Sequence, residues 1–277
     1  MSQTVLITGA STGFGRATAE RFQSEGWNVV ATMRSPADGG DLAELPNTIV
    51  TRLDVTDSPS IGQAVAEAKA AFGSIDVLVN NAGFGAYGPL ESTDMAVVRR
   101  QFDTNVIGLL EVTQAVLPVM REGGAGVIVN ISSVGGKMTF PLGSLYHGSK
   151  FAVEGLSEAL VYELAPLGIG VKIVEPGFCD TDFAGRSFVL SLDPAGGAYQ
   201  PTVEAVLAAF ATLQTQELGT AAGVAEAIFG AATDGTSQLR YVVGADAIAT
   251  LGARAALDDA AFLDMIRGSF GLAVESD

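Results

Sequence analysis

Short apolar runs alternate along the chain with longer stretches in which apolar positions recur at helical spacing. The apolar runs are residues 4–8, 28–33, 48–53, 77–80, 126–132, 171–175 and 240–244. The first six are nearly continuous, which is typical of strands buried on both faces. Helical patterns lie between them, at 14–25, 60–72, 95–121 and 149–164.

This alternation indicates βαβ units, and therefore an α/β fold whose parallel sheet carries helices on both faces. Because such crossovers are right-handed, the sheet is expected to be doubly wound. No linker or repeat interrupts the pattern, so we expect one domain over residues 1–277. Residues 178–202 are the least regular part, which is typical of a lid or a disordered segment. The weakly helical stretch 252–272 could cover an edge of the sheet.

Composition bounds the setting of this domain. The 277 residues are 48% hydrophobic and carry a formal net charge of −16, which argues against nucleic acid or anionic membrane as a partner. Cys179 is the only cysteine, so no intrachain disulfide can form and a reducing compartment is expected. We see neither a signal peptide pattern nor an apolar run long enough to span a bilayer, and expect a cytoplasmic protein.

A glycine-rich segment, TGASTGFG at residues 8–15, joins the first strand to the first helix. Gly9 would let the chain turn off the strand, Gly13 would let a phosphate approach the backbone, and Gly15 would let the helix pack tightly. Free N–H groups and the helix dipole would then hold a pyrophosphate. The spacing is not the common GxGxxG, and turns need glycine anyway. The position after a first strand nevertheless favours dinucleotide binding over a purely structural turn.

Five further motifs follow this loop: NNAG (80–83), NVIG (105–108), NISS (130–133), YHGSK (146–150) and PGFCDT (176–181). In order and spacing, from about residue 5 to 181, the chain resembles the short-chain dehydrogenase/reductase family, in its single-domain TGxxxGxG/YxxxK branch. The resemblance implies a Rossmann-type sheet of seven strands, a nicotinamide cofactor, hydride transfer between an alcohol and a carbonyl, and a homodimer or homotetramer. Residues 146–177 look most like members acting on retinoids, hydroxysteroids and other lipophilic ketones.

Carbonyl reduction needs a proton donor and a group that polarises the carbonyl. Tyr146 can give the proton, and Lys150, four residues on along a helix, would lower its pKa from about 10. Ser133, at the end of the fifth strand, can hydrogen-bond the substrate oxygen; Ser132 competes for this place, and the family spacing favours Ser133. The resemblance carries the same roles onto these residues and adds Asn105, implying a water-linked proton relay to Lys150.

His147 is the only histidine, and histidine is the usual proton carrier near neutral pH. On a helix it points about 100° away from Tyr146, so we expect a local structural or exposed role. A Ser-His-Asp hydrolase is not expected, because no GxSxG elbow is present. A metal site is not expected either, since ligands at suitable spacing are missing.

The end of the second strand bears on cofactor choice. NAD-binding members place an acid there for the ribose 2′-OH, whereas this chain has Met33 and Arg34. Arginine can pair with a 2′-phosphate, so we expect NADP(H) over NAD(H); an ordinary surface arginine is the alternative. Asp54 matches the family's adenine contact, or is a turn residue. The expected cofactor contacts are Gly9, Ser11, Gly13, Phe14, Gly15, Arg34, Asp54, Asn81, Ala82, Gly83, Tyr146, Lys150, Pro176, Gly177 and Thr181.

Apolar side chains fall in the loops expected at the carboxyl edge of the sheet, where they would line a pocket or anchor the loops into the core. They are Phe84, Tyr87, Phe140, Leu142, Phe178, Phe183, Phe188 and Leu190, of which we assign Phe84, Phe140, Leu142, Phe178 and Phe183 to the substrate pocket. We therefore predict an NADP(H)-dependent oxidoreductase acting on an apolar ketone or alcohol. The alternative is an NADP(H)-sensing regulatory protein without significant turnover. The four expected catalytic residues, all present, favour the enzyme.

Overall fold

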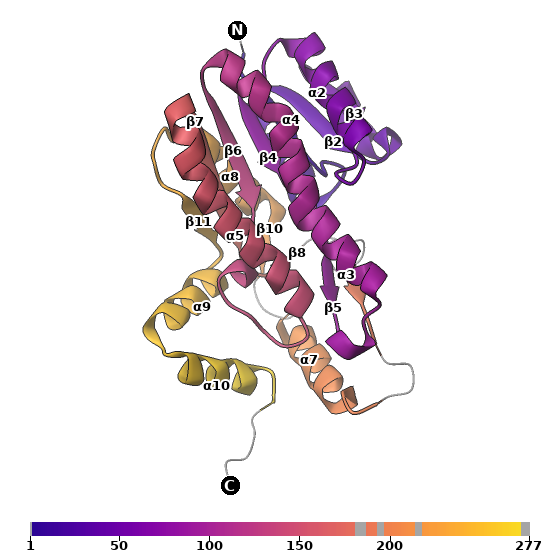
Figure 1. Ribbon diagram of the computed structural model, residues 1–277, viewed down its shortest axis with the longest axis vertical. Coiled ribbons are helices and arrows are strands. Elements are labelled where there is room, and N and C mark those ends of the chain that lie inside the picture. Colours follow the sequence, from indigo (N-terminus) through magenta and orange to yellow (C-terminus); the bar gives the residue numbers. More distant parts are fainter. Residues whose placement is uncertain (1, 181–186, 193–196, 214–217, 273–277) are drawn as a thin grey trace.

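The computed structural model describes residues 2–180, 187–192, 197–213 and 218–272. Its centre is a seven-stranded sheet in the order β11-β7-β6-β4-β1-β2-β3, in which every neighbouring pair is parallel (Figure 1). The strands are β1 (Thr4–Ile7), β2 (Asn28–Met33), β3 (Thr48–Arg52), β4 (Val77–Asn80), β6 (Gly126–Ile131), β7 (Ile169–Pro176) and β11 (Arg240–Val243). The predicted doubly wound α/β sheet is confirmed, and its strand order reverses between β1 and β4.

The helices cover both faces of the sheet. They are α1 (Gly13–Ser24), α2 (Ser58–Phe72), α3 (Met95–Phe102), α4 (Gly108–Gly123), α5 (Ser144–Leu164), α7 (Gln200–Leu213), α8 (Ala221–Thr233), α9 (Ala245–Ala256) and α10 (Asp259–Ser269). The helix predicted over 95–121 is interrupted by a π-helical turn, Asp103–Ile107, and the one predicted to begin at residue 149 begins at Ser144. Within the described residues, no helix is both long and apolar enough to cross a bilayer.

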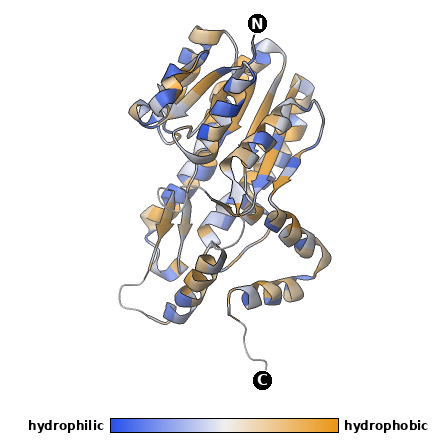
Figure 2. Ribbon diagram, turned by 180° about the vertical axis from the view of Figure 1, so that it is seen from behind, coloured by the Kyte–Doolittle hydropathy of each residue, from blue (hydrophilic) through white to orange (hydrophobic). Residues whose placement is uncertain are grey.

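Alternate strand residues supply two separate cores, which explains the continuous apolar runs. On β1, Val5 and Ile7 face the core formed with α1 and α8, whereas Leu6 faces the core formed with α2, α4 and α5. All three side chains are fully buried. Accordingly, the strands are hydrophobic along most of their length in Figure 2, while the helices alternate in colour.

A third apolar cluster lies beyond the carboxyl ends of the strands, and we call it the aromatic cluster. Its buried members are Tyr87, Val134, Met138, Phe140, Val206, Ala247, Phe262, Ile266 and Phe270. Helices α7, α9 and α10 contribute to it, together with two short paired strands, β5 (Gly85–Tyr87) and β9 (Phe188–Leu190). The C-terminal stretch is therefore helical as predicted, but it packs on this cluster rather than along an edge of the sheet.

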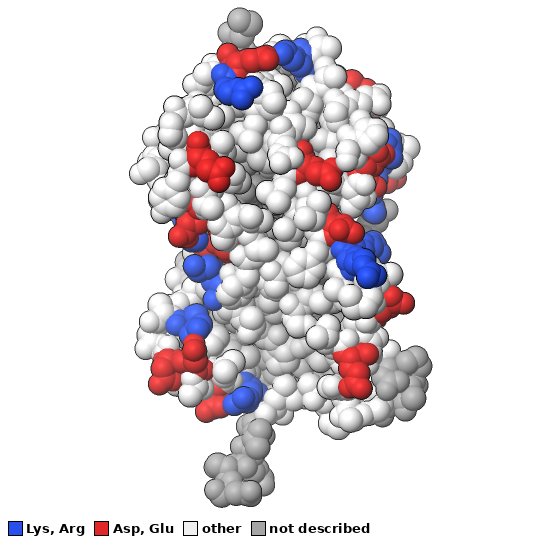
Figure 3. Space-filling view, viewed as in Figure 1, with Lys and Arg blue, Asp and Glu red and all other residues white. Residues whose placement is uncertain are grey.

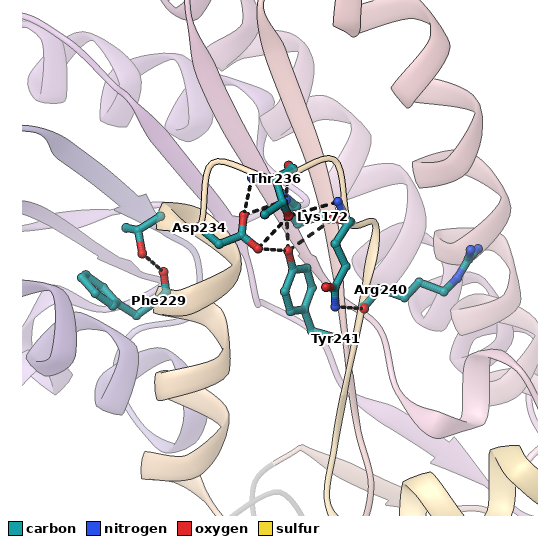
Figure 4. Close-up of polar contacts among 8 residues, drawn as sticks. Lys172, Phe229, Asp234, Thr236, Arg240 and Tyr241 are labelled. Carbon is teal, nitrogen blue, oxygen red and sulfur yellow. Dashed lines mark hydrogen bonds and ion pairs between the residues drawn. The ribbon is translucent and has the colours of Figure 1, made fainter.

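A buried lysine fixes the connection between α8 and β11. Lys172 of β7 donates from Nζ to Asp234 Oδ1 (3.1 Å), to the carbonyl of Thr236 (2.7 Å) and to the hydroxyl of Tyr241 (3.0 Å) (Figure 4). The Tyr241 hydroxyl also donates to Asp234. Because Lys172 is only 4% exposed, its charge needs these partners, so the network locks β11 onto β7.

Candidate active site

The motif segments meet at the carboxyl edge of the sheet, beside the point where the strand order reverses. Each follows a different strand: the glycine loop after β1, NNAG at the end of β4, Ser133 after β6 and Gly177 after β7. Parallel strands bring such loops to one edge, which is where ligands of open α/β sheets bind.

The glycine loop has the geometry expected of a phosphate cradle. Gly9 and Gly13 adopt positive φ angles of 70° and 56°. A Cβ on Gly15 would lie 2.6 Å from Asn81 Nδ2 and closer still to the carbonyl of Gly9, so the helix start can approach the strand only with glycine here. A Cβ on Gly13 would meet no described atom within 4 Å. Thr12, the N-cap, gives the helix no side-chain hydrogen bond within the described residues, so the first N–H groups of α1 are not capped by it and suit an anion. Ser11 and Phe14, also expected to contact the cofactor, lie in this loop and its first helical turn, both partly buried.

Thr8 is a residue whose role the sequence analysis missed. Its hydroxyl accepts hydrogen bonds from the backbone N–H groups of Asn81 and Ala82, both at 3.0 Å. Asn81 Nδ2 donates in return to the carbonyls of Thr8 (2.8 Å) and Gly9 (3.1 Å). The NNAG segment is thereby fastened to the glycine loop. The available signal was a threonine at the end of the first strand.

At the end of β2, Met33 is buried and Arg34 is exposed. Arg34 forms no hydrogen bond or ion pair with any residue that the structure describes, although its charge helps to lower the pKa of Asp54. Arg16, in contrast, is engaged by Glu20, Asp41 and the carbonyl of Gly39. Arg34 is therefore the arginine left available at this strand end.

Asp54 acts as a turn residue in this structure. Its Oδ1 accepts from the backbone N–H of Thr56 (3.0 Å) and from the Thr56 hydroxyl (2.8 Å). Burial raises the pKa of Asp54, but these hydrogen bonds and two nearby arginines outweigh it and leave the pKa lowered. The adenine contact stays a prediction.

Tyr146 and Lys150 lie one turn apart on α5, beside Ser133. Ser133 caps the short helical turn Val134–Gly136, and its Oγ accepts from the N–H of Gly135 at 3.0 Å. Burial raises the pKa of Tyr146, and a hydrogen bond with Ser133 partly opposes the rise. Lys150 Nζ lies 5.8 Å from the centroid of the Tyr146 ring and donates to the carbonyl of Ile131 at 2.8 Å.

The expectation that Lys150 lowers the pKa of Tyr146 is not met in the protein by itself. Burial lowers the pKa of Lys150 to about 8. The lysine is therefore mainly protonated at pH 7, and it loses its proton at a lower pH than an exposed lysine. Burial also dominates at Tyr146, which leaves the phenol neutral and able to give a proton.

Ser132 faces away from this group. Its Oγ is buried near Gly136, whose Cβ, if present, would lie 2.5 Å from Ser132 Oγ and 3.0 Å from Glu154 Cγ. Ser133, not Ser132, therefore accompanies Tyr146, because the two adjacent residues point to opposite sides.

Asn105 lies in the π-helical turn, and its side chain makes three hydrogen bonds to residues outside the turn. Its Oδ1 accepts from the N–H of Phe84 (3.0 Å), and its Nδ2 donates to the carbonyl of Phe84 (2.8 Å) and to Ser149 Oγ (3.1 Å). A Cβ on Gly83 would lie 3.1 Å from Asn105 Oδ1. Asn105 thus holds the NNAG segment against α5. The water-linked proton relay to Lys150 stays a prediction.

His147 is a buried residue with a structural role, which was one of the two roles expected for it. The other expectation, an exposed side chain, is wrong. Its Nε2 accepts from the N–H of Phe140 at 3.1 Å, so Nδ1 carries the proton that is donated to the carbonyl of Gly135 at 2.8 Å. Burial lowers the pKa of His147 to about 4. The ring fastens the segment after Ser133 to α5.

Most of the predicted pocket residues join the aromatic cluster. Phe140, Leu142 and Phe178 belong to it, as do Tyr87, Phe188 and Leu190, and the Tyr87 ring lies 5.5 Å from that of Tyr146. The sequence analysis missed two further members, Phe210 of α7 and Phe270. The Phe210 ring packs edge-on against Phe140, and the Phe270 ring stacks on Phe140. Phe84 does not belong to the cluster: its buried ring lies 4.6 Å below the Arg100 guanidinium. Phe183 and Thr181 lie outside the described residues.

The predicted irregular loop 178–202 contains some regular structure. Cys179–Asp180 (β8) pairs with Gly219–Thr220 (β10), and β9 pairs with β5. Residues 181–186 and 193–196 lie outside the described part, and a lid function stays a prediction.

Pro176 and Gly177 are at the end of β7, as expected, and Asp246 of α9 contacts them from an unforeseen direction. Asp246 Oδ2 accepts from the N–H of Phe178 at 2.7 Å, and a Cβ on Gly177 would lie 2.6 Å from Asp246 Cγ. Helix α9 therefore fixes the loop that leaves β7. Among the described residues, no group of three or more His, Cys, Asp or Glu side chains could hold a metal ion.

The sequence of this chain matches the family model described as short chain dehydrogenase over residues 3–188. The chain belongs to the short-chain dehydrogenase family. An uncharacterized oxidoreductase of Schizosaccharomyces pombe is 42% identical over 245 residues, which cover 87% of this chain and all of that protein. A 3-ketodihydrosphingosine reductase of Bacteroides thetaiotaomicron is 43% identical over 190 residues, 69% of each chain.

Solved structures of this family share the fold. A short-chain dehydrogenase from Streptomyces avermitilis has a TM-score of 0.82 and 36% identity, over 99% of this chain and 100% of that one. A short-chain dehydrogenase/reductase from Burkholderia phymatum in complex with NAD has a TM-score of 0.78 and 29% identity, over 92% and 93%. ElxO with NADP bound has a TM-score of 0.71 and 29% identity, over 87% and 98%. The protein is thus an oxidoreductase of a family that binds nicotinamide cofactors of both kinds.

Proposed function

We propose that this protein is an NADP(H)-dependent oxidoreductase that interconverts an apolar ketone and its secondary alcohol. The observation that carries the proposal is the group formed by Tyr146, Ser133 and Lys150. It lies at the cofactor edge of the sheet and borders on the aromatic cluster. A proton donor, a polarising hydroxyl and a cation are therefore available beside an apolar surface.

In the proposed reaction, the nicotinamide supplies the hydride when the cofactor is bound. Ser133 donates a hydrogen bond to the substrate oxygen, and Tyr146 transfers its phenolic proton to the same oxygen. Lys150 then stabilises the tyrosinate that is left, since an adjacent cation favours the charged form. Asn105 keeps Phe84 and α5 in place. In the oxidative direction, the same groups take the proton away from the alcohol.

The residues present fit a dinucleotide. The open N-terminus of α1 and the empty space beside Gly13 would take the pyrophosphate, and Lys150 would face the nicotinamide end. Arg34 would pair with a 2′-phosphate, because it is exposed and is not engaged by the described residues. With Met33 buried in the core, no carboxylate stands at that position to accept from a ribose 2′-OH.

An apolar substrate suits the aromatic cluster. Its members Tyr87, Phe140 and Phe178 and the neighbouring Phe210 offer ring surfaces next to Tyr146 and include no charged group. The 3-ketodihydrosphingosine reductase of B. thetaiotaomicron is named for a ketone, which supports the same class of substrate.

A panel of ketones with NADPH, monitored by loss of cofactor absorbance, tests the proposal against a regulatory protein that binds NADPH without turnover. Tyr146→Phe is expected to abolish turnover and to leave NADPH binding within a few-fold. Tyr162→Phe is a matched control, since Tyr162 lies on the same helix and is 76% exposed. Wild-type turnover in Tyr146→Phe would refute the assignment of the acid, and absence of turnover across the panel in the wild type would favour the regulator.

Cofactor choice is tested by kcat/KM for NADPH and NADH with one saturating ketone. A charge-assisted hydrogen bond contributes ~1.5–3 kcal/mol, so Arg34→Ala should weaken use of NADPH by roughly ten- to a hundredfold and leave NADH nearly unchanged. Arg52→Ala is the control, because Arg52 is an exposed arginine at the end of the neighbouring strand, paired with Asp57. A wild type that uses NADH as well as NADPH contradicts this part.

We further propose that the protein is cytoplasmic and forms a homo-oligomer. In this oligomer, two subunits would contact each other through α4 and α5. Ile107 and Phe151 are 47% and 45% exposed on and beside these helices. The middle of this face carries few charged side chains (Figure 3). Sedimentation of the wild type and of Phe151→Glu would test the interface: a monomeric wild type contradicts it, and a dimer or tetramer that Phe151→Glu dissociates supports it.

A further inference from the structure

Two carboxyl groups are buried on α5 and β7, one of them a helical turn beyond Lys150. Glu154 lies one turn further along α5 and is 4% exposed, while Glu175, near the end of β7, is 1% exposed. Carboxylates are almost never buried to this extent without partners. The proposed mechanism uses neither of them.

One arginine reaches both carboxyl groups. Arg240 of β11 leaves its strand on the side opposite to Tyr241, toward α5 (Figure 4). Its guanidinium lies 2.9 Å from Glu154 Oε2, 3.4 Å from Glu175 Oε1 and 2.7 Å from Glu158 Oε2. Glu158 is half exposed, so the solvent shares in its stabilisation and only the two buried groups depend on protein partners.

The hydrogen-bond count of this site is incomplete when both buried groups are ionised. Glu154 Oε1 and Glu175 Oε1 accept no hydrogen bond from the described residues, and the ion pair of Glu175 Oε1 with Arg240 Nε is 3.4 Å long. The two side chains are in hydrogen-bonding contact with each other. Two carboxylates that touch each other in a buried site repel and cannot both ionise cheaply. A single proton between them removes the repulsion and supplies the missing donor.

Other charged groups surround the pair. The charged groups that face the site are Lys150 and Glu158 on α5, Arg240 on β11 and the exposed Lys137 after β6. With both buried carboxylates ionised, the three positive charges balance the three negative ones, and with one proton on the pair the sum is +1. The reason for the shared proton is therefore the direct contact of the two carboxyl groups and their missing donor, rather than the sum of charges.

We propose that Glu154 and Glu175 share one proton, and that Glu154 is the counter-charge that keeps Lys150 protonated in the active site. The second half rests on the proposed function, in which the charge of Lys150 stabilises the tyrosinate. Glu154 acts through Lys150 and is therefore a positioning residue rather than a catalytic one.

The electrostatics of the site agree with this arrangement. Burial raises the pKa of Glu175, and the neighbouring Glu154 raises it further. Burial lowers the pKa of Lys150 to about 8, and Glu154 opposes that decrease. Without the charge of Glu154, Lys150 would lose its proton closer to neutral pH.

Infrared spectroscopy tests the shared proton without any turnover. At pH 7 the wild type should show the C=O stretch of a buried carboxylic acid, because ordinary exposed carboxyl groups are ionised at that pH. Glu154→Gln and Glu175→Gln should each abolish it, since the remaining carboxylate then has Arg240 to itself. Absence of the band in the wild type, or its persistence in both variants, would overturn the shared proton.

The alkaline limb of the pH profile of kcat/KM tests the counter-charge. Glu154→Gln should move this limb to lower pH by about one unit. The single negative charge of the pair then lies on Glu175, and Glu154 is the carboxylate that opposes the lowering of the Lys150 pKa. Glu158→Gln is the matched control, because it removes another partner of Arg240 and should leave the limb unchanged. A uniform loss of activity with an unmoved limb would show that Glu154 is only structural. Failure of the proposed function, by contrast, would appear as absence of turnover in the wild type, with the infrared result unaffected.

Discussion

Lowering the pH from 7 to 4.5 should add a proton to His147 in the unfolded chain but largely not in the folded protein. In the fold, Nε2 already accepts from the N–H of Phe140 and Nδ1 donates to the carbonyl of Gly135. A second ring proton, on Nε2, would therefore point at the N–H of Phe140, which is itself a donor. His147 is only 1% exposed, so water cannot take the place of this partner. Burial accordingly lowers the pKa from 6.5 to about 4.

The difference between the two pKa values sets the size of the effect. The folded-state pKa of His147 is lower than its unfolded-state pKa. As the pH falls below 6.5, the unfolded chain therefore takes up a proton that the folded protein does not yet bind. The contribution of His147 is fully present above pH 6.5 and is lost down to about pH 4, by about 1.4 kcal/mol for each pH unit. Between pH 7 and 4.5 the loss is about 2.5 kcal/mol of the free energy of unfolding.

Urea unfolding of the wild type and of His147→Gln, at fixed protein concentration and at several pH values between 7 and 4.5, measures this contribution. At pH 7 the wild type should be the more stable, because glutamine cannot keep both hydrogen bonds. That advantage should shrink by about 2.5 kcal/mol at pH 4.5. Acidic groups titrate in both proteins, so the difference between the two curves isolates the histidine.

A difference in stability that stays constant over this pH range would refute the reasoning. Nuclear magnetic resonance offers an independent check, since the chain has one histidine. The imidazole should show the Nδ1–H tautomer and should not titrate near pH 6.5; a titration there would mean that the ring is accessible and that its two hydrogen bonds are not maintained.

Three further outcomes are expected. Gly15→Ala should lower Tm markedly even without cofactor, because its Cβ would collide with the carbonyl of Gly9. Gly13→Ala should lower the free energy of unfolding by only about 1 kcal/mol, because of the positive φ, and should mainly weaken cofactor binding. Equal losses of Tm in the two variants would contradict the geometry. Lys172→Met should lower the free energy of unfolding by about 1–3 kcal/mol, measured by urea unfolding, and an unchanged midpoint would show that the network adds nothing. Phe210→Ala should raise KM for a bulky apolar ketone by about tenfold and hardly affect a short one; equal effects on both would argue against the aromatic cluster as substrate surface.

The sequence was sufficient for the sheet because the signal there is local. Each strand of this parallel sheet is buried on both faces, so it appears as a continuous apolar run, and six motifs keep fixed positions relative to those strands. The same holds for Tyr146, Lys150 and Ser133: their spacing on one helix and at one strand end carried the prediction. The boundaries that failed, such as the π-helical turn at Asp103–Ile107, depend on a shift of hydrogen bonding that apolar periodicity does not record.

Only the tertiary structure decided what surrounds these residues. The sequence determined that His147 stands next to Tyr146, but its two hydrogen bonds come from a loop whose path the pattern does not show. Phe84 lies outside the aromatic cluster with its ring against the Arg100 guanidinium, whereas Phe270 joins the cluster from near the C-terminus. Glu154 and Glu175 are ordinary acidic residues in the sequence, and they become a buried pair only because β7, β11 and α5 pack together. The burial of a group and the charges around it depend on residues that are distant in sequence. The sequence therefore determines which groups are present, whereas the tertiary structure determines their neighbours and their protonation.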